Sequence, residues 1–131
     1  MLRFRLPADD LEYAVLRSLW ELRNASVRDL HDRVGAPEGL VYTTTAKVVD
    51  RLRDKGLVQR SRQAGAFVYS PRVDREVVER AKARQLMSRL LGQGPRPAVA
   101  PLVDAVGDID PALLDALERA IQARKGGDHG T

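Results

Sequence analysis

Residues 41–70 read VYTTTAKVVDRLRDKGLVQRSRQAGAFVYS, and the spacing of their inward-facing side chains changes partway along. In the first half, these side chains recur at i, i+3, i+4 and i+7, and they are Thr45, Val48, Val49 and Leu52. This spacing predicts an amphipathic helix over residues 41–55. Gly56 then ends the helix, because glycine readily adopts the left-handed conformation that closes a helix.

After Gly56 the period changes from 3.6 residues to two, which is the period of a strand. Residues 57–62 form the first predicted strand and residues 63–65 form the turn. Residues 66–70 form the returning strand, which Pro71 stops. The stretch therefore predicts a helix that is followed directly by a two-stranded hairpin.

Positive charge is concentrated in this helix and in the strand after it. The cations between residues 47 and 62 are Lys47, Arg51, Arg53, Lys55, Arg60 and Arg62, and the anions are Asp50 and Asp54. The segment thus has a net charge of +4, which equals that of the whole chain, so all other residues sum to zero. A local positive field of this kind attracts a polyanion. A solvated helix face is the alternative explanation.

Two further helices are predicted before residue 41. The first covers about residues 9–23 and carries an apolar stripe made of Leu11, Val15, Leu16, Leu19, Trp20 and Leu22. The second begins at the N-cap Ser26, with Asp29 three residues later, and ends at Gly35. Three helices and a hairpin, with cations on the third helix and the hairpin, follow the order of a winged helix-turn-helix.

From residue 73 onward the pattern predicts helices only. They cover about residues 74–91, 98–106 and 111–124, and glycines and prolines at 92–97 separate the first two. The predicted fold class is therefore mainly α with a small β hairpin (α+β). The predicted parts are a winged-helix domain at 1–72, a helical dimerisation region at 73–125 and a disordered tail at 126–131.

The winged-helix order predicts which side chains would meet duplex DNA. A recognition helix enters the major groove, where its N-terminal residues reach base edges, while flanking cations reach phosphates. Hydroxyl groups and cations on the outer side of the third helix and on the hairpin suit these contacts. The candidate DNA-binding residues are Thr43, Thr44, Lys47, Arg51, Arg60, Arg62 and Gln63.

The C-terminal helical region is too short to build a strong core by itself, so its apolar stripes need a partner. A second copy of the chain would bury them. The candidate dimerisation residues are Val77, Ala81, Leu90, Leu91, Leu102, Leu113, Leu114, Leu117 and Ile121. A two-fold dimer would also present two recognition helices about 34 Å apart, one turn of the duplex.

Catalytic and metal chemistry have no support in the sequence. There is no cysteine, and neither His31 nor His129 has a second ligand nearby, so we expect no metal and no cofactor. His31 is expected to be an ordinary surface or interface histidine. No nucleophile–base pair or phosphate loop is present, so no enzyme is expected. No apolar run suggests a signal peptide or membrane insertion, which favours a cytoplasmic location.

Several runs of residues match a known pattern. They are Leu40–Thr45, Asp50–Leu52, Lys55–Val58, Phe67–Pro71, and Glu12–Leu16 followed by Leu19 and Trp20. Together they resemble the penicillinase-repressor (BlaI/MecI/CopY) family over about residues 8–124. The resemblance implies a homodimeric transcriptional repressor that binds double-stranded DNA at palindromic operators with half-sites of TACA/TGTA type. It also implies release by proteolysis linked to a membrane sensor, or by a metal in the copper-responsive branch.

The chain departs from this family in its release signals and in the third helix. The copper-responsive branch uses a C-terminal cysteine cluster, and this chain has no cysteine. Penicillinase repressors are cut at an Asn-Phe bond, whereas the single asparagine here is Asn24. The corresponding stretch, Leu102–Ala105, is open to a protease of another specificity. Thr45 and Ala46 replace more apolar residues of the family helix, which would loosen its packing or shift its contacts.

The alternative function is a winged-helix protein-interaction module within a larger complex. That function predicts an exposed apolar patch on the third helix or the hairpin in place of a cationic one. The positions of the cations favour DNA.

Overall fold

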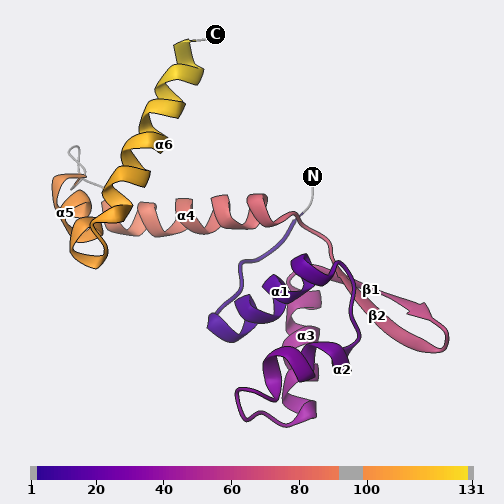
Figure 1. Ribbon diagram of the computed structural model, residues 1–131. Coiled ribbons are helices and arrows are strands. Elements are labelled where there is room, and N and C mark those ends of the chain that lie inside the picture. Colours follow the sequence, from indigo (N-terminus) through magenta and orange to yellow (C-terminus); the bar gives the residue numbers. More distant parts are fainter. Residues whose placement is uncertain (1–2, 92–98, 130–131) are drawn as a thin grey trace. The chain divides into compact units, whose positions relative to one another are not determined.

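The computed structural model describes residues 3–91 and 99–129 (Figure 1). The chain divides into two compact units, Met1–Gln85 and Leu86–Thr131. The elements are α1 (Asp10–Leu22), α2 (Val27–Leu30), a π-helical turn η1 (His31–Gly35), α3 (Tyr42–Asp54), β1 (Val58–Gln63), β2 (Ala66–Pro71), α4 (Arg75–Leu91), α5 (Val99–Ile109) and α6 (Ala112–His129). The mainly helical class with one hairpin is confirmed.

The helix starts of the first unit follow local chemistry. Asp9 caps α1, because its carboxylate accepts the backbone N–H of Glu12 at 2.8 Å. Ser26 and Asp29 form a reciprocal capping box at the start of α2, with bonds of 3.0 and 3.1 Å. The predicted second helix exists, but its second half is the π-helical turn η1.

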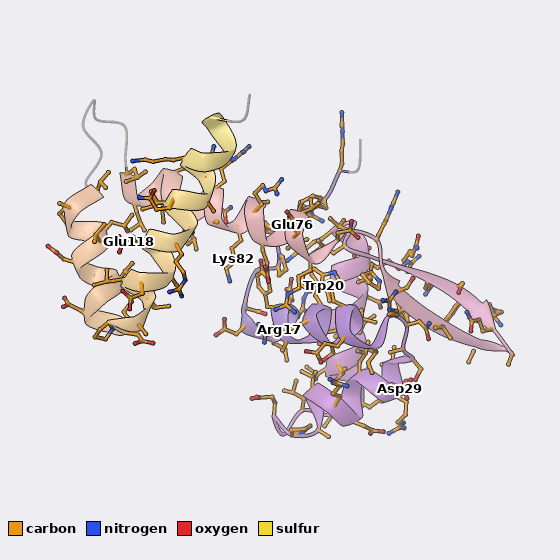
Figure 2. All side chains as sticks on the ribbon, turned by 45° about the horizontal axis from the view of Figure 1, so that its top comes forward. Arg17, Trp20, Asp29, Glu76, Lys82 and Glu118 are labelled. Atoms are coloured by element: carbon orange, nitrogen blue, oxygen red, sulfur yellow. The ribbon has the colours of Figure 1, made fainter. Side chains whose placement is uncertain are left out.

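One hydrophobic core joins α1, α3 and the hairpin. The predicted inner side of α3 is confirmed, since Thr45, Val48, Val49 and Leu52 are all buried. On α1 the buried apolar residues include Val15, Leu16 and Leu19, while Leu22 is 37% exposed. Trp20 lies between α1 and the start of α4 (Figure 2), and its indole Nε1 donates to the Val73 carbonyl at 2.9 Å.

The hairpin projects from the helices of the first unit (Figure 1). Its strands are antiparallel, and Gln63 pairs with Ala66 across a two-residue loop. Both loop residues, Ala64 and Gly65, have positive φ angles of 50° and 82°, as the tight turns of twisted hairpins require. Tyr69 also exchanges backbone hydrogen bonds of 2.8 and 2.9 Å with Ala25, which ties the hairpin to the segment after α1.

The first unit continues past the hairpin. Val73 and Val78 are buried in the same core, so the unit extends to Gln85, beyond residue 72 where the sequence suggested a boundary. The N-terminal segment also belongs to this unit: Arg5 N donates to the Lys55 carbonyl at 2.8 Å. The assignment of DNA binding and dimerisation to separate parts remains a prediction.

The second unit has a different character. Among the described residues, none after Val78 is buried. Helix α6 continues to His129, whereas the sequence predicted its end near Arg124 and a disordered tail from 126. Glycine lowers helix propensity by only about 1 kcal/mol, and no proline follows to stop the helix. Residues 130–131 and the break predicted at 92–97 lie outside the described residues. Within the described ranges, no helix has the length and apolar character needed to cross a membrane.

Candidate nucleic-acid interface

The outer side of α3 carries the polar residues that the sequence singled out. Thr43, Lys47 and Arg51 are exposed, at intervals of four residues, and Thr44 is half-buried beside them. The side chains on the opposite side of the helix fill the core. Because the inner side is fixed by packing, the outer side presents hydroxyl groups near the helix N-terminus and cations further along.

Arg60 and Arg62 lie on one face of the hairpin. Arg60 pairs with Tyr69 and Arg62 pairs with Phe67, and directly opposed residues share a face. Both guanidinium groups stack on the Phe67 ring, at 4.1 and 4.7 Å from its centroid. Gln63 directly follows Arg62, and successive side chains of a strand point to opposite faces, so Gln63 lies on the other face of the hairpin. The hairpin thus holds two arginines together over one aromatic ring.

Phe67 was not among the residues that the sequence analysis singled out for this surface. Its role depends on the strand register, and the two-residue turn at Ala64 and Gly65 sets that register. We call the set Thr43, Thr44, Lys47, Arg51, Arg60 and Arg62 the cationic face.

A buried carboxylate lies behind α3. The side chain of Glu12, on α1, is only 2% exposed, and its Oε1 accepts from Lys55 Nζ at 2.5 Å. Its Oε2 lies 3.4 Å from Arg51 Nε. Glu12 can be buried as a carboxylate because two cations of the α3 region neutralise it. The spacing of the sequence indicated this burial, because Glu12 precedes Leu16 by four residues and Leu19 by seven and therefore lies on the same side of α1.

These ion pairs divide the cations of α3 into two kinds. Lys55 is 14% exposed at its side chain, and its charge is matched by Glu12. Arg51 is half exposed, so only its Nε edge faces Glu12 and the rest of the guanidinium remains available. Lys47 appears in none of the ion pairs formed by the described residues, and it is exposed.

His31 is buried inside the first unit, whereas the sequence predicted an ordinary surface or interface histidine. Its Nδ1 lies 2.8 Å from the Thr45 hydroxyl, which gives the ring a polar partner inside the domain. Gly35 makes this contact possible, because a Cβ there would lie 2.0 Å from Thr45 Oγ1. The threonine that replaces a more apolar residue of the resembled family therefore contributes a buried hydrogen bond between η1 and α3.

The beginning of α3 is held by aromatic contacts. The ring of Tyr42 meets the edge of the His31 ring at a centroid distance of 5.7 Å. The Arg28 guanidinium also lies over the Tyr42 ring, 4.7 Å from its centroid. Neither Arg28 nor Tyr42 was predicted from the sequence to belong to this surface. Since Arg28 belongs to α2, these contacts fix the first turn of α3 against the preceding helix.

Two shifted pKa values belong to the packing of α1 and α4. Burial, assisted by Glu79 and opposed by Arg17, raises the pKa of Tyr13 above its ordinary value of 10.0. Lys82, shown in Figure 2, contributes a cation 4.0 Å from the Tyr13 centroid. A hydrogen bond to Glu79 raises the pKa of Arg75. In the part of the chain that the structure describes, no three His, Cys, Asp or Glu residues are grouped to hold a metal ion.

Comparison with known proteins gives consistent results. Residues 9–123 match the model of a family described as penicillinase repressor. Two curated relatives, from Mycobacterium tuberculosis strains CDC 1551 / Oshkosh and ATCC 25618 / H37Rv, are named transcriptional regulator BlaI. Each is 33% identical over 122 residues, which cover 92% of this chain and 86% of the relative.

Two solved structures are also similar to this chain. A MarR family transcriptional regulator from Silicibacter pomeroyi DSS matches 91% of this chain and 71% of its own, with 20% identity and a TM-score of 0.46. A variant of ZitR from Lactococcus lactis matches 93% of this chain and 76% of its own, with 11% identity and a TM-score of 0.45.

Proposed function

This chain belongs to the penicillinase repressor family of transcriptional regulators, and from that premise we propose that it represses transcription as a homodimer on a palindromic operator. The proposed site of action is the cytoplasm. The cationic face is the observation that best supports DNA binding. It consists of the outer side of α3 and the two hairpin arginines that stack on Phe67. In this proposal α3 enters the major groove and the hairpin reaches the flanking backbone.

The hairpin arginines give the first test. In the proposed homodimer, the double change Arg60→Ala and Arg62→Ala removes two phosphate contacts from each protomer. We expect binding to an operator-bearing duplex at 0.1 M salt to weaken by roughly 60-fold per protomer, which is about 4,000-fold for the dimer. The reason is that each lost phosphate contact costs about eightfold at that salt concentration. Fluorescence anisotropy with a labelled duplex selected from genomic DNA measures this loss.

The matched control is Arg119→Ala with Arg124→Ala, which removes the same charge from exposed positions on α6. It should change affinity by less than a quarter of the loss seen for the hairpin variant. Equal losses for the two double variants would show that net charge, and not the cationic face, determines binding.

The homodimer is the second element of the proposal. In the described parts of α5 and α6, no side chain is buried. The apolar residues Val99, Ile109, Leu113 and Ile121 are between 42% and 79% exposed. Exposed apolar surface on this scale favours association. A two-fold dimer would double the DNA contacts and raise affinity through effective concentration.

A charged pair of substitutions on α6 tests the dimer. Leu113 and Ile121 are eight residues apart and share one helical stripe, so Leu113→Asp with Ile121→Asp should yield a monomer in analytical ultracentrifugation. Arg119→Asp changes the charge by the same two units at an exposed position about 120° from Leu113 and about 160° from Ile121 around the helix, and it should leave the dimer intact. A double variant that still sediments as a dimer would contradict this assignment.

Release by proteolysis is the third element. The candidate stretch Leu102–Ala105 lies within α5, so a protease linked to a membrane sensor would need this helix to open locally. Such opening is favoured because α5 buries no residue in the described chain. Since neither the Asn-Phe bond nor a cysteine cluster is present, the protease would have another specificity.

A further inference from the structure

Val41 is an unusual residue at the start of a helix, where Ser, Thr, Asp or Asn is preferred as the N-cap. It occupies the N-cap of α3 in an extended conformation (φ −82°, ψ 158°), and its side chain makes no capping hydrogen bond. By contrast, Asp9 and Ser26 both use a side-chain oxygen to cap α1 and α2. Val41 is also 65% exposed, so burial does not explain an apolar residue at this position.

The position of Val41 is nevertheless fixed. Its carbonyl accepts the backbone N–H of Thr44 at 3.0 Å and of Thr45 at 3.3 Å. The next residue, Tyr42, contacts both the Arg28 guanidinium and the His31 ring. The exposed methyl groups are therefore presented by a well-held backbone at the N-terminal end of α3.

The chemistry of the major groove suggests what these methyl groups meet. Among the groups that the four bases present there, hydrogen-bond donors and acceptors predominate, and the thymine C5-methyl is the apolar exception. The first residues of a recognition helix are those that approach base edges. Val41 cannot form a side-chain hydrogen bond, so an apolar contact is the one base readout that it can make.

We propose that Val41 is a specificity-determining residue that contacts the C5-methyl group of a thymine in each half-site. The inference rests on the proposed function, and it adds the chemical group that is read and the residue that reads it. It also explains why an N-cap with poor capping ability is placed at this helix start: the side chain serves recognition at the expense of local capping.

The test replaces thymine with deoxyuridine, which removes the C5-methyl group and keeps base pairing. Starting from the tightest duplex selected from genomic DNA, each thymine is replaced in turn and the dissociation constant is measured. For the wild-type chain, we expect about fourfold weaker binding at one position per half-site, the value of one methyl group removed from water. For Val41→Ser, the thymine and deoxyuridine duplexes should bind equally.

Thermal unfolding separates recognition from folding. Val41→Ser restores a capping side chain, so its unfolding midpoint should equal or exceed that of the wild type. The control Ala83→Ser introduces the same hydroxyl group at an exposed position of α4 and should retain the methyl preference.

Three results would overturn the inference. The first is equal wild-type affinity for thymine and deoxyuridine at every position. The second is a Val41→Ser variant that retains the preference. The third is loss of the preference in Thr43→Ser, which would assign it to the threonine methyl. In all three cases DNA binding itself stands, whereas a wild-type chain that binds no duplex would overturn the proposed function as well.

Discussion

Gly35→Ala is expected to lower the stability of the first unit by about 3 kcal/mol. The new Cβ would lie 2.0 Å from Thr45 Oγ1 and 2.6 Å from His31 Nδ1, so the buried His31–Thr45 hydrogen bond must separate. Overpacking a core costs about 1–3 kcal/mol, and an unsatisfied buried polar group costs about as much again. Urea denaturation followed by circular dichroism measures the change.

The backbone at Gly35 gives no competing reason for glycine, because it is not among the residues with positive φ. The loss is therefore steric. Gly126→Ala is the matched control, since a Cβ there meets nothing within 4 Å and alanine favours a helix. Equal midpoints for Gly35→Ala and the wild type would refute the account of this contact.

Glu12→Ala is expected to cost about 3 kcal/mol as well, by a different mechanism. The substitution leaves Lys55 without its partner at a position where its side chain is 14% exposed. Removing one member of a buried ion pair typically costs about 3–5 kcal/mol, and the partial exposure of Lys55 places the expected value at the lower end. Arg51 also loses the carboxylate that faces its Nε.

A double-mutant cycle tests this directly. Lys55→Met combined with Glu12→Ala should recover most of the lost stability, because no unpaired buried charge remains. Glu76→Ala is the control: its ion pair with Arg80 is exposed, and such pairs contribute about 1 kcal/mol or less. If Glu12→Ala cost no more than Glu76→Ala, the buried pair would have no structural importance.

The parts of the fold that follow from local spacing were predictable. Thr45, Val48, Val49 and Leu52 repeat at helical intervals, and the alternation after Gly56 predicts a strand, so α3 and the hairpin could be derived from adjacent residues. The cations of the cationic face could be placed for the same reason, because the inner side of a helix determines its outer side.

The parts that depend on distant residues were not predictable in the same way. Glu12 is buried because Lys55, 43 positions later, neutralises it, and His31 is buried because Thr45, 14 positions later, meets its ring. Neither partner can be identified from periodicity alone. Val78 likewise packs into the core of the first compact unit through residues that are distant in the sequence.

The salt dependence of DNA affinity tests the central claim most directly. The dissociation constant of the wild-type chain for duplex DNA is measured between about 50 and 200 mM salt. If Lys47, Arg51, Arg60 and Arg62 of both protomers each neutralise a phosphate, the logarithm of affinity falls against the logarithm of salt with a slope of about −7. An affinity that does not change with salt, or no binding at the lowest salt concentration, would contradict the claim that the cationic face binds DNA.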